Sequence, residues 1–372
     1  AEFAGRMART RAEMERRGLD ALLLFAPESH YWLTGYDTFG FCFFQCLVVH
    51  AGEPVLLTRS ADLRQAELTS TIRDIRIWRD REGADPTADL VALLRDLGLA
   101  ESRLGWETTT QGLVHAHGAA LAARLPRLVE ASDLVPGLRL VKSPAEIAHV
   151  RRAAELADAA WDAGLAETAP GAHEGRILAA MQGAVFEGDG DYAGNEFVIG
   201  SGDHALLCRY ASGRRRLGGR AQITLEWAGA YRHYHAALMK TVVVGEPGAR
   251  HAALQAAAEE ALLACEDALL PGRPMGDVFA AHARVLDGHG LAEHRLNACG
   301  YSLGARFSPC WMDDRMFYEG AETVMAPGMV FFLHMILMDS GSGAAMTLGR
   351  TSLVTEGGAE PLSRPPLDLT VV

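Results

Sequence analysis

A short polar stretch in the second half of the chain carries the side chains best suited to acid–base chemistry. Glu226 lies in a predicted strand, a turn is expected at 228–230, and a returning strand is expected to begin at Tyr231. Alternate residues of a strand point to the same face, so Tyr231, His233 and His235 should lie together. A carboxylate beside imidazoles can take up and release a proton near neutral pH.

Three further residues could complete such a site. His334 stands alone in an apolar predicted strand and is either a second acid–base group or a hydrogen-bonded core histidine. Arg209 stays protonated and cannot act as a base, but its guanidinium suits a substrate carboxylate; the alternative is a solvated strand residue. Tyr301 either donates a hydrogen bond to the substrate or packs in the core.

A metal site built from these residues is not expected. His233, His235 and His334 are three imidazoles, and three histidines can hold zinc. Paired histidines more often serve hydrogen bonding, however, so we predict no metal and no other cofactor. Stoichiometric zinc in purified protein would contradict this prediction. Six scattered cysteines contain no C-x-x-C pair, which indicates reduced thiols in a cytoplasmic protein.

Two domains are predicted to position these side chains, one over residues 1–136 and the other over 137–372. The first alternates short apolar strands with helical segments, which is typical of an α/β domain. The second opens with a helix that begins at a capping box, in which Ser143 is followed three residues later by Glu146.

The second domain also contains an internal echo. Pro170-Gly171 precedes one predicted helix, and Pro271-Gly272 precedes another about one hundred residues later. Each helix leads into a β-rich segment that contains glycine. We therefore expect two similar halves with a cleft between them.

Composition narrows the range of partners. The chain has 372 residues, of which 49% are hydrophobic, and 35 basic against 47 acidic residues give a formal charge of −12. An acidic surface repels phosphate backbones and anionic lipid, so neither nucleic acid nor a membrane is an expected partner. No apolar run reaches the ~20 residues of a membrane helix, and no secretory signal is recognisable.

The order of these segments resembles the creatinase/aminopeptidase P superfamily, whose members share the pita-bread fold. The resemblance covers roughly residues 5–365 and rests on these segments: 139–147, 223–245, 300–304, 326–330 and 353–360. It implies an N-terminal creatinase-like α/β domain followed by a pseudo-symmetric α+β pita-bread domain. It also implies a homodimer in which one subunit's N-terminal domain lines the other's cleft, with Tyr36, Phe39, Phe41 and Phe43 as aromatic walls.

The resemblance also implies that the peptidase reaction is absent. Metallopeptidases of this group hold two divalent ions with two Asp, one His and two Glu, since hard cations prefer oxygen ligands. Aligning the motifs places the following residues at these positions: Trp227, Ala237, Tyr301, His334 and Gly349. None of the five residue types is kept in this alignment.

A metal-free branch fits better. The segment 225–238 is similar to ectoine hydrolase, and creatinase hydrolyses a C–N bond with a histidine instead of a metal; here Arg209 takes that histidine's position. The resemblance implies a metal-independent hydrolase of a non-peptide C–N bond (amidine, guanidine or cyclic amide) in a small, amino-acid-derived substrate that carries a carboxylate. The expected catalytic residues are Glu226, His235 and His334, and the expected substrate-binding residues are Arg209, His233 and Tyr301. Two alternatives stay open: a biosynthetic cyclase, dehydratase or lyase on the same scaffold, and a catalytically silent peptide-binding protein.

Overall fold

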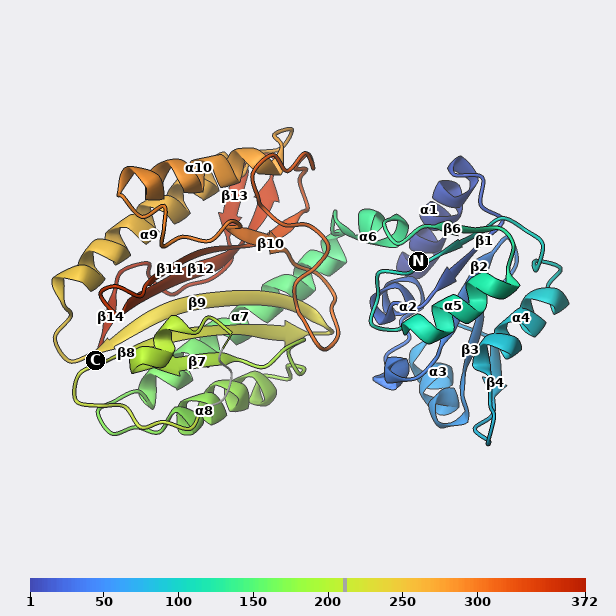
Figure 1. Ribbon diagram of the computed structural model, residues 1–372, viewed down its shortest axis with the longest axis horizontal. Coiled ribbons are helices and arrows are strands. Elements are labelled where there is room, and N and C mark those ends of the chain that lie inside the picture. Colours follow the sequence, from blue (N-terminus) through green and yellow to red (C-terminus); the bar gives the residue numbers. More distant parts are fainter. Residues whose placement is uncertain (210–212) are drawn as a thin grey trace. The chain divides into compact units, whose positions relative to one another are not determined.

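The computed structural model describes residues 1–209 and 213–372, which form two compact units (Figure 1). The N-terminal unit comprises residues 1–139 and the C-terminal unit residues 140–372. Each unit has its own sheet and its own apolar core. The expected mixed α/β architecture is confirmed.

The N-terminal unit contains a six-stranded sheet in the order β4-β3-β2-β1-β5-β6. Its strands are β1 (Ala21–Leu24), β2 (Cys46–His50), β3 (Val55–Arg59), β4 (Asp74–Trp78), β5 (Leu104–Trp106) and β6 (Leu128–Glu130). Its helices are α1 (Glu2–Arg16), α2 (Pro27–Thr34), α3 (Leu63–Thr69), α4 (Pro86–Asp96), α5 (His115–Arg124) and α6 (Leu134–Arg139), with short 3-10 turns η1 (Gly40–Cys42) and η2 (Ser60–Asp62). Alternating residues of β2 face opposite sides, so that Val48 and Leu47 belong to two separate apolar clusters. Strands β2 and β3 pair antiparallel as a hairpin.

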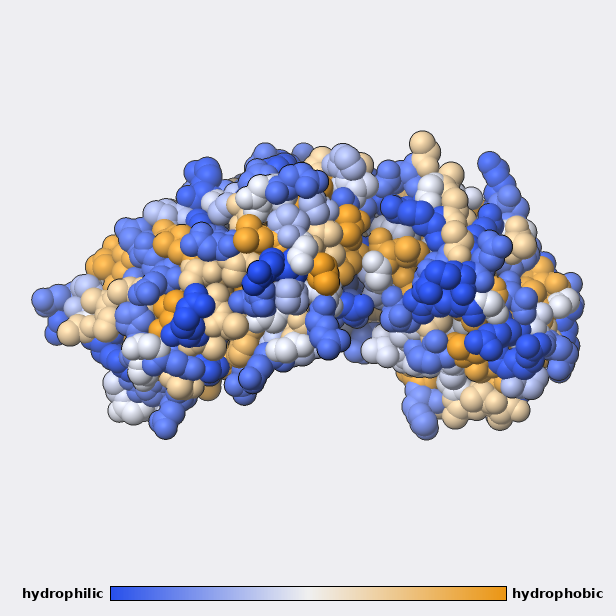
Figure 2. Space-filling model, turned by 90° about the horizontal axis from the view of Figure 1, so that it is seen from above, coloured by the Kyte–Doolittle hydropathy of each residue, from blue (hydrophilic) through white to orange (hydrophobic). Residues whose placement is uncertain are grey.

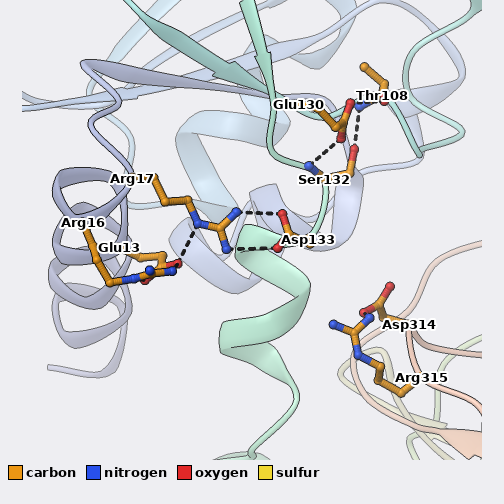
Figure 3. Close-up of polar contacts among 9 residues, drawn as sticks. All are labelled: Glu13, Arg16, Arg17, Thr108, Glu130, Ser132, Asp133, Asp314 and Arg315. Carbon is orange, nitrogen blue, oxygen red and sulfur yellow. Dashed lines mark hydrogen bonds and ion pairs between the residues drawn. The ribbon is translucent and has the colours of Figure 1, made fainter. Parts of the chain in front are cut away.

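Figure 3 shows polar contacts of the N-terminal unit, together with the Asp314–Arg315 pair of the C-terminal unit. Arg17 follows α1 and donates to both carboxylate oxygens of Asp133, at 2.7 and 3.0 Å, and also to Glu13. These bonds connect α1 to the segment that leads into α6. The pairs are partly exposed, so each contributes at most about 1 kcal/mol. They involve no residue of the predicted site.

The C-terminal unit is built on an eight-stranded sheet whose two halves repeat the same arrangement of strands. Six strands follow the order β10-β11-β12-β9-β8-β7, while β13 pairs with β12 and β14 with β9. The strands are β7 (Val198–Ser201), β8 (Ala221–Tyr231), β9 (Tyr234–Val244), β10 (Gly300–Ser302), β11 (Val330–Asp339), β12 (Ala344–Thr355), β13 (Gly358–Pro361) and β14 (Thr370–Val371). The helices are α7 (Pro144–Ala166), α8 (Glu174–Glu187), α9 (Ala249–Ala268) and α10 (Met275–Gly288), with a 3-10 turn η3 (Gly202–Leu206). Apart from β13 and β14, each half consists of three strands and two helices, which confirms the predicted internal repeat.

In each half of the C-terminal unit, a long helix covers one face of the two longest strands. In one half α7 packs on β8 and β9, and in the other α9 packs on β11 and β12 (Figure 1). The predicted capping box at the start of α7 is present, with Ser143 and Glu146 bonded reciprocally. Side chains on the opposite faces of β8 and β11, among them Glu226 and His334, are left for the site.

The predicted turn of the β8–β9 hairpin was wrong. The strands are joined by Arg232 and His233, both with positive φ, at 48° and 61°. Tyr231 therefore ends β8 and His235 lies in β9, so Tyr231, His233 and His235 do not share one strand face. A two-residue turn with positive φ at both positions normally contains Asn, Asp or Gly, and Arg-His gives no such signal.

Gly229 was expected in a turn, but a glycine is needed there because a helix packs closely against the strand. It lies inside β8, where α7 approaches so closely that a Cβ at this position would stand 2.0 Å from the carbonyl oxygen of Ala153. The neighbouring Trp227 faces the same helix, and its indole Nε1 donates to the Ala157 carbonyl at 2.8 Å. A glycine within a strand often marks such a close approach of two backbones.

Several aromatic side chains of the N-terminal unit differ in exposure. Tyr36 is 1% exposed and belongs to the apolar core, so it cannot form an aromatic wall for a partner, contrary to expectation. Phe39 and Phe43 are 79% and 47% exposed and are available for such a contact.

On the face drawn in Figure 2, apolar and hydrophilic residues are interspersed. Among the described residues, no helix is long and apolar enough to cross a membrane.

Candidate active site

A cavity of about 300 Å³ in the C-terminal unit brings together four of the six predicted site residues. Arg209, Glu226, Tyr301 and His334 all line it. Much of the remaining wall is apolar and comes from Leu296, Ala298, Met312, Met316 and Ile336. A small apolar cavity with a few converging polar groups is the usual form of a ligand site.

The strand register explains why these residues meet. Glu226 on β8 stands opposite Met239 on β9, Met239 stands opposite Gly349 on β12, and Gly349 stands opposite His334 on β11. Residues that are directly paired point to the same face of the sheet. Glu226 and His334 therefore project from one face, and Tyr301 joins them from β10, the neighbour of β11.

Glu226 is the central acidic group. It is 9% exposed, and its Oε1 accepts a hydrogen bond from the Tyr301 hydroxyl at 3.3 Å. Burial raises the pKa of Glu226 to about 7, although the charge of Arg209 and the bond from Tyr301 act in the opposite direction. Both protonation states of this carboxyl are thus populated near neutral pH.

His334 is buried and lines the same cavity as Glu226. Burial lowers the pKa of His334 to about 3, so the imidazole is neutral at pH 7. Among the described residues, its Nδ1 has no hydrogen-bond partner. The ring lies 5.7 Å from that of Tyr301, centroid to centroid. A buried polar atom without a partner is costly, and the ring that carries it lines the cavity.

Tyr301 connects Glu226 to a residue that the sequence analysis missed. Its hydroxyl accepts a hydrogen bond from the indole Nε1 of Trp311 at 2.7 Å. Tyr301 is 3% exposed, and burial raises the pKa of its phenol well above the ordinary value, so the phenol stays protonated. Trp311 lies in an irregular segment without periodicity, and no feature of the sequence linked it to Tyr301.

Arg209 lies on the wall of the cavity and is solvent-exposed. Its charge is close enough to lower the pKa of Glu226. Nearby in the sequence, Arg215 pairs with Asp203. Arg209 is a cation at the cavity whose charge acts on the buried carboxyl of Glu226.

His235 and His233 do not line the cavity. His235 is fully buried, its Nε2 accepts the Gly194 N–H at 2.9 Å, and its Nδ1 lies 3.5 Å from the Gly304 carbonyl. Burial lowers the pKa of His235 to about 3. His233 lies in the hairpin turn and stacks on Phe307 at 4.1 Å. Both rings are held in place by the protein itself.

The residues at the metal-ligand positions do not fit a two-ion centre. Trp227 faces α7, and Glu226 is the residue that shares a face with Ala237, so the motif alignment was displaced by one residue there. The corrected set supplies one carboxylate and one imidazole, from Glu226 and His334. Over residues 1–209 and 213–372, no group of three His, Cys, Asp or Glu could hold a metal ion.

The space near Gly349 is filled in a way that opposes a larger residue. A Cβ at this position would lie 2.6 Å from the Leu333 carbonyl oxygen and 2.9 Å from the ring of Phe332. The ring of Phe332 thus occupies the place where a side chain at 349 would begin. This packing is a second reason why the ligand set of the metallopeptidases does not fit here.

Comparisons with known proteins extend over the whole chain. Residues 148–356 match the model of metallopeptidase family M24, and residues 6–141 match the creatinase/prolidase N-terminal domain. Ectoine hydrolase of Halomonas elongata is 28% identical, with 100% of this chain and 97% of that protein aligned. The crystal structure of dipeptidase PepE from Mycobacterium ulcerans aligns with a TM-score of 0.87 at 26% identity, covering 100% and 98% of the two chains. Xaa-Pro dipeptidase from Bacillus anthracis has a TM-score of 0.86 at 20% identity and full coverage of both chains.

Proposed function

The chain belongs to metallopeptidase family M24, a family of hydrolases, and from this premise we propose that it hydrolyses a non-peptide C–N bond without a metal. The substrate is a small amino-acid derivative that carries a carboxylate and an amidine, guanidine or cyclic amide. One observation carries the proposal: the Glu226–Tyr301 pair lies beside His334 in a cavity whose donor set does not suit two cations.

Glu226 is the proposed acid–base group. As a carboxylate it takes a proton from the water that adds to the C=N or C=O carbon, and as an acid it returns that proton to the departing nitrogen. The C–N bond then breaks, and the amine leaves with the proton. A group whose pKa is near the working pH serves both steps well, and burial of Glu226 supplies such a pKa.

His334 and Tyr301 are proposed to hold the substrate and the developing charge. The imidazole of His334 lines the cavity and can bond to the substrate there. Because the ring is neutral, one of its nitrogens donates and the other accepts. Tyr301 stabilises the carboxylate form of Glu226 through its hydroxyl.

Arg209 is proposed to bind the substrate carboxylate at the wall of the cavity. A planar guanidinium binds a carboxylate through two parallel hydrogen bonds. The apolar wall, including Met312 and Ile336, then packs against the carbon skeleton. His235 and His233, expected to act in the site, are instead proposed to fix the local backbone.

A substrate panel with three variants tests this function. Amidine, guanidine and lactam acids are screened for hydrolysis with and without a chelator, alongside Xaa-Pro dipeptides with and without manganese. We expect turnover of one of the small acids in the presence of chelator, and a loss of about a hundredfold or more in His334→Ala. Arg209→Leu should raise KM with less effect on kcat, while the exposed His115→Ala is the control. Metal-dependent dipeptide cleavage, or full turnover by His334→Ala, would refute the proposal.

We also propose that the protein forms a homodimer through its N-terminal unit. The exposed rings of Phe39 and Phe43 support this proposal, since large exposed aromatic side chains often mark contacts. Light scattering coupled to gel filtration measures the mass directly. A mass near 40.0 kDa at micromolar concentration would contradict it.

A further inference from the structure

Trp311 lies behind the Tyr301–Glu226 pair and is held from two directions. It is 1% exposed, and its indole Nε1 donates to the Tyr301 hydroxyl at 2.7 Å. Its backbone N–H donates to Oδ1 of Asn195 at 3.2 Å, which ties the segment before β7 to the segment after β10. The indole is therefore fixed relative to the phenol.

The chemistry of the two rings determines the direction of the hydrogen bonds. An indole nitrogen carries one hydrogen and accepts none, so the Tyr301 oxygen must be the acceptor in its bond with Trp311. A phenol has a single hydrogen of its own. With Trp311 on one side of the oxygen, that hydrogen is directed to Oε1 of Glu226, at 3.3 Å.

We propose that Trp311 is a positioning residue, which acts through the Tyr301 hydroxyl to keep that hydroxyl's proton directed at Glu226. Donation to the phenol oxygen also makes the phenol a stronger donor, because successive hydrogen bonds polarise one another. The carboxylate form of Glu226 gains from both effects. For turnover this inference rests on the proposed function, whereas the effect on Glu226 follows from the geometry alone.

The hydrogen bond from Trp311 explains how the Tyr301 hydroxyl keeps its position in a site whose residues do not suit two metal ions. In the motif alignment Tyr301 stands at the position of a metal-binding histidine of the resembled metallopeptidases. Here the bond from Trp311 holds the phenol hydroxyl. The other charged or titratable groups at the cavity are Arg209, Cys208 and His334, and the variants below leave all three unchanged.

A double-mutant cycle between Trp311→Phe and Tyr301→Phe tests the inference. Two kinds of measurement are made: kcat and KM with the substrate found by the panel, and the titration midpoint of Glu226 from its carboxyl infrared band, assigned with Glu226→Gln. We expect Trp311→Phe to lower kcat about tenfold with little change in KM, because orientation is lost rather than binding. The Glu226 midpoint should rise. In the Tyr301→Phe background, Trp311→Phe should have no further effect on either quantity.

A second tryptophan provides a matched control. Trp227 is equally buried and also loses one indole hydrogen bond on substitution by Phe, but it faces α7 on the other side of the sheet. Any shift that Trp227→Phe causes in the Glu226 titration midpoint should add to the shift caused by Tyr301→Phe. If Trp311→Phe proves unstable, Asn195→Ala loosens the same indole and should give a smaller change that also vanishes in Tyr301→Phe.

Additive effects of Trp311→Phe and Tyr301→Phe on the Glu226 midpoint would overturn the inference. An unchanged midpoint in Trp311→Phe would overturn it as well. The midpoint needs no substrate, so these results are separate from a failure of the proposed hydrolysis.

Discussion

Replacing Glu226 by glutamine should change how the stability of the C-terminal unit depends on pH. Burial raises the pKa of Glu226 from 4.5 to about 7 in the folded protein. The folded state thus holds this proton more tightly than the unfolded chain. Protonation of Glu226 therefore adds to the free energy of unfolding, and this contribution is fully present below pH 4.5 and is lost as pH rises through 7. Glutamine cannot titrate and lacks this loss.

The size of the effect follows from the two pKa values. At about 1.36 kcal/mol per pH unit, the wild-type protein loses about 2.5 kcal/mol more than Glu226→Gln between about pH 5 and pH 8. The amide also introduces a constant change in stability, but that change cancels when the two pH values are compared. The same substitution should lower turnover by about a hundredfold or more, since the proposed acid–base group is gone.

Amide hydrogen exchange in β8 and β9 is a suitable assay, because it reports the opening free energy of the C-terminal unit separately from the N-terminal unit. Glu187→Gln is the control, since Glu187 is exposed at the end of α8. Its stability difference from the wild type should stay within about 0.5 kcal/mol at both pH values. A pH-independent difference for Glu226→Gln would refute the assigned environment of this carboxyl, and full activity would refute its role.

Two further predictions separate structural from catalytic residues. His235→Ala removes the acceptor of the Gly194 N–H and leaves that buried group unpaired, so thermal unfolding should show a loss of about 1–3 kcal/mol. Its turnover should stay within about tenfold of the wild type, and a larger loss would return His235 to the catalytic set. Gly229→Ala places a Cβ 2.0 Å from the Ala153 carbonyl and should cost more than about 3 kcal/mol in urea unfolding. Gly183→Ala in α8, with nothing within 4 Å, should instead gain up to about 1 kcal/mol; equal effects would contradict the close approach of α7.

Much of the C-terminal unit was predictable because several independent signals agreed. The capping box at Ser143 and the repeated Pro-Gly steps predicted the first helix and the two halves, and both are present. The hairpin turn failed because the local signal was misleading. Gly229 is needed where a helix approaches a strand, and the true turn at Arg232 and His233 has no residue typical of its backbone angles.

Only part of the site could be predicted from the sequence. Glu226, Tyr301 and His334 come from strands far apart in the sequence, and only the ordered motifs of a known fold indicated that they meet. The displaced turn put Tyr231 and His235 on one face, whereas the observed register places them on opposite faces and leaves His235 on the face of Glu226 but outside the cavity. Trp311 was missed because a hydrogen bond to a phenol from an irregular segment leaves no pattern in the sequence.

The ring of Phe332 against Gly349 limits the evolutionary routes open to this protein. A glutamate introduced at 349 would meet the aromatic ring and a backbone carbonyl before its carboxylate could reach any ion. Enlarging this one position therefore requires both the ring of Phe332 and the strand that carries Leu333 to move, at a cost to core packing. Substitutions on the pocket wall should thus be accepted more readily than any side chain at 349.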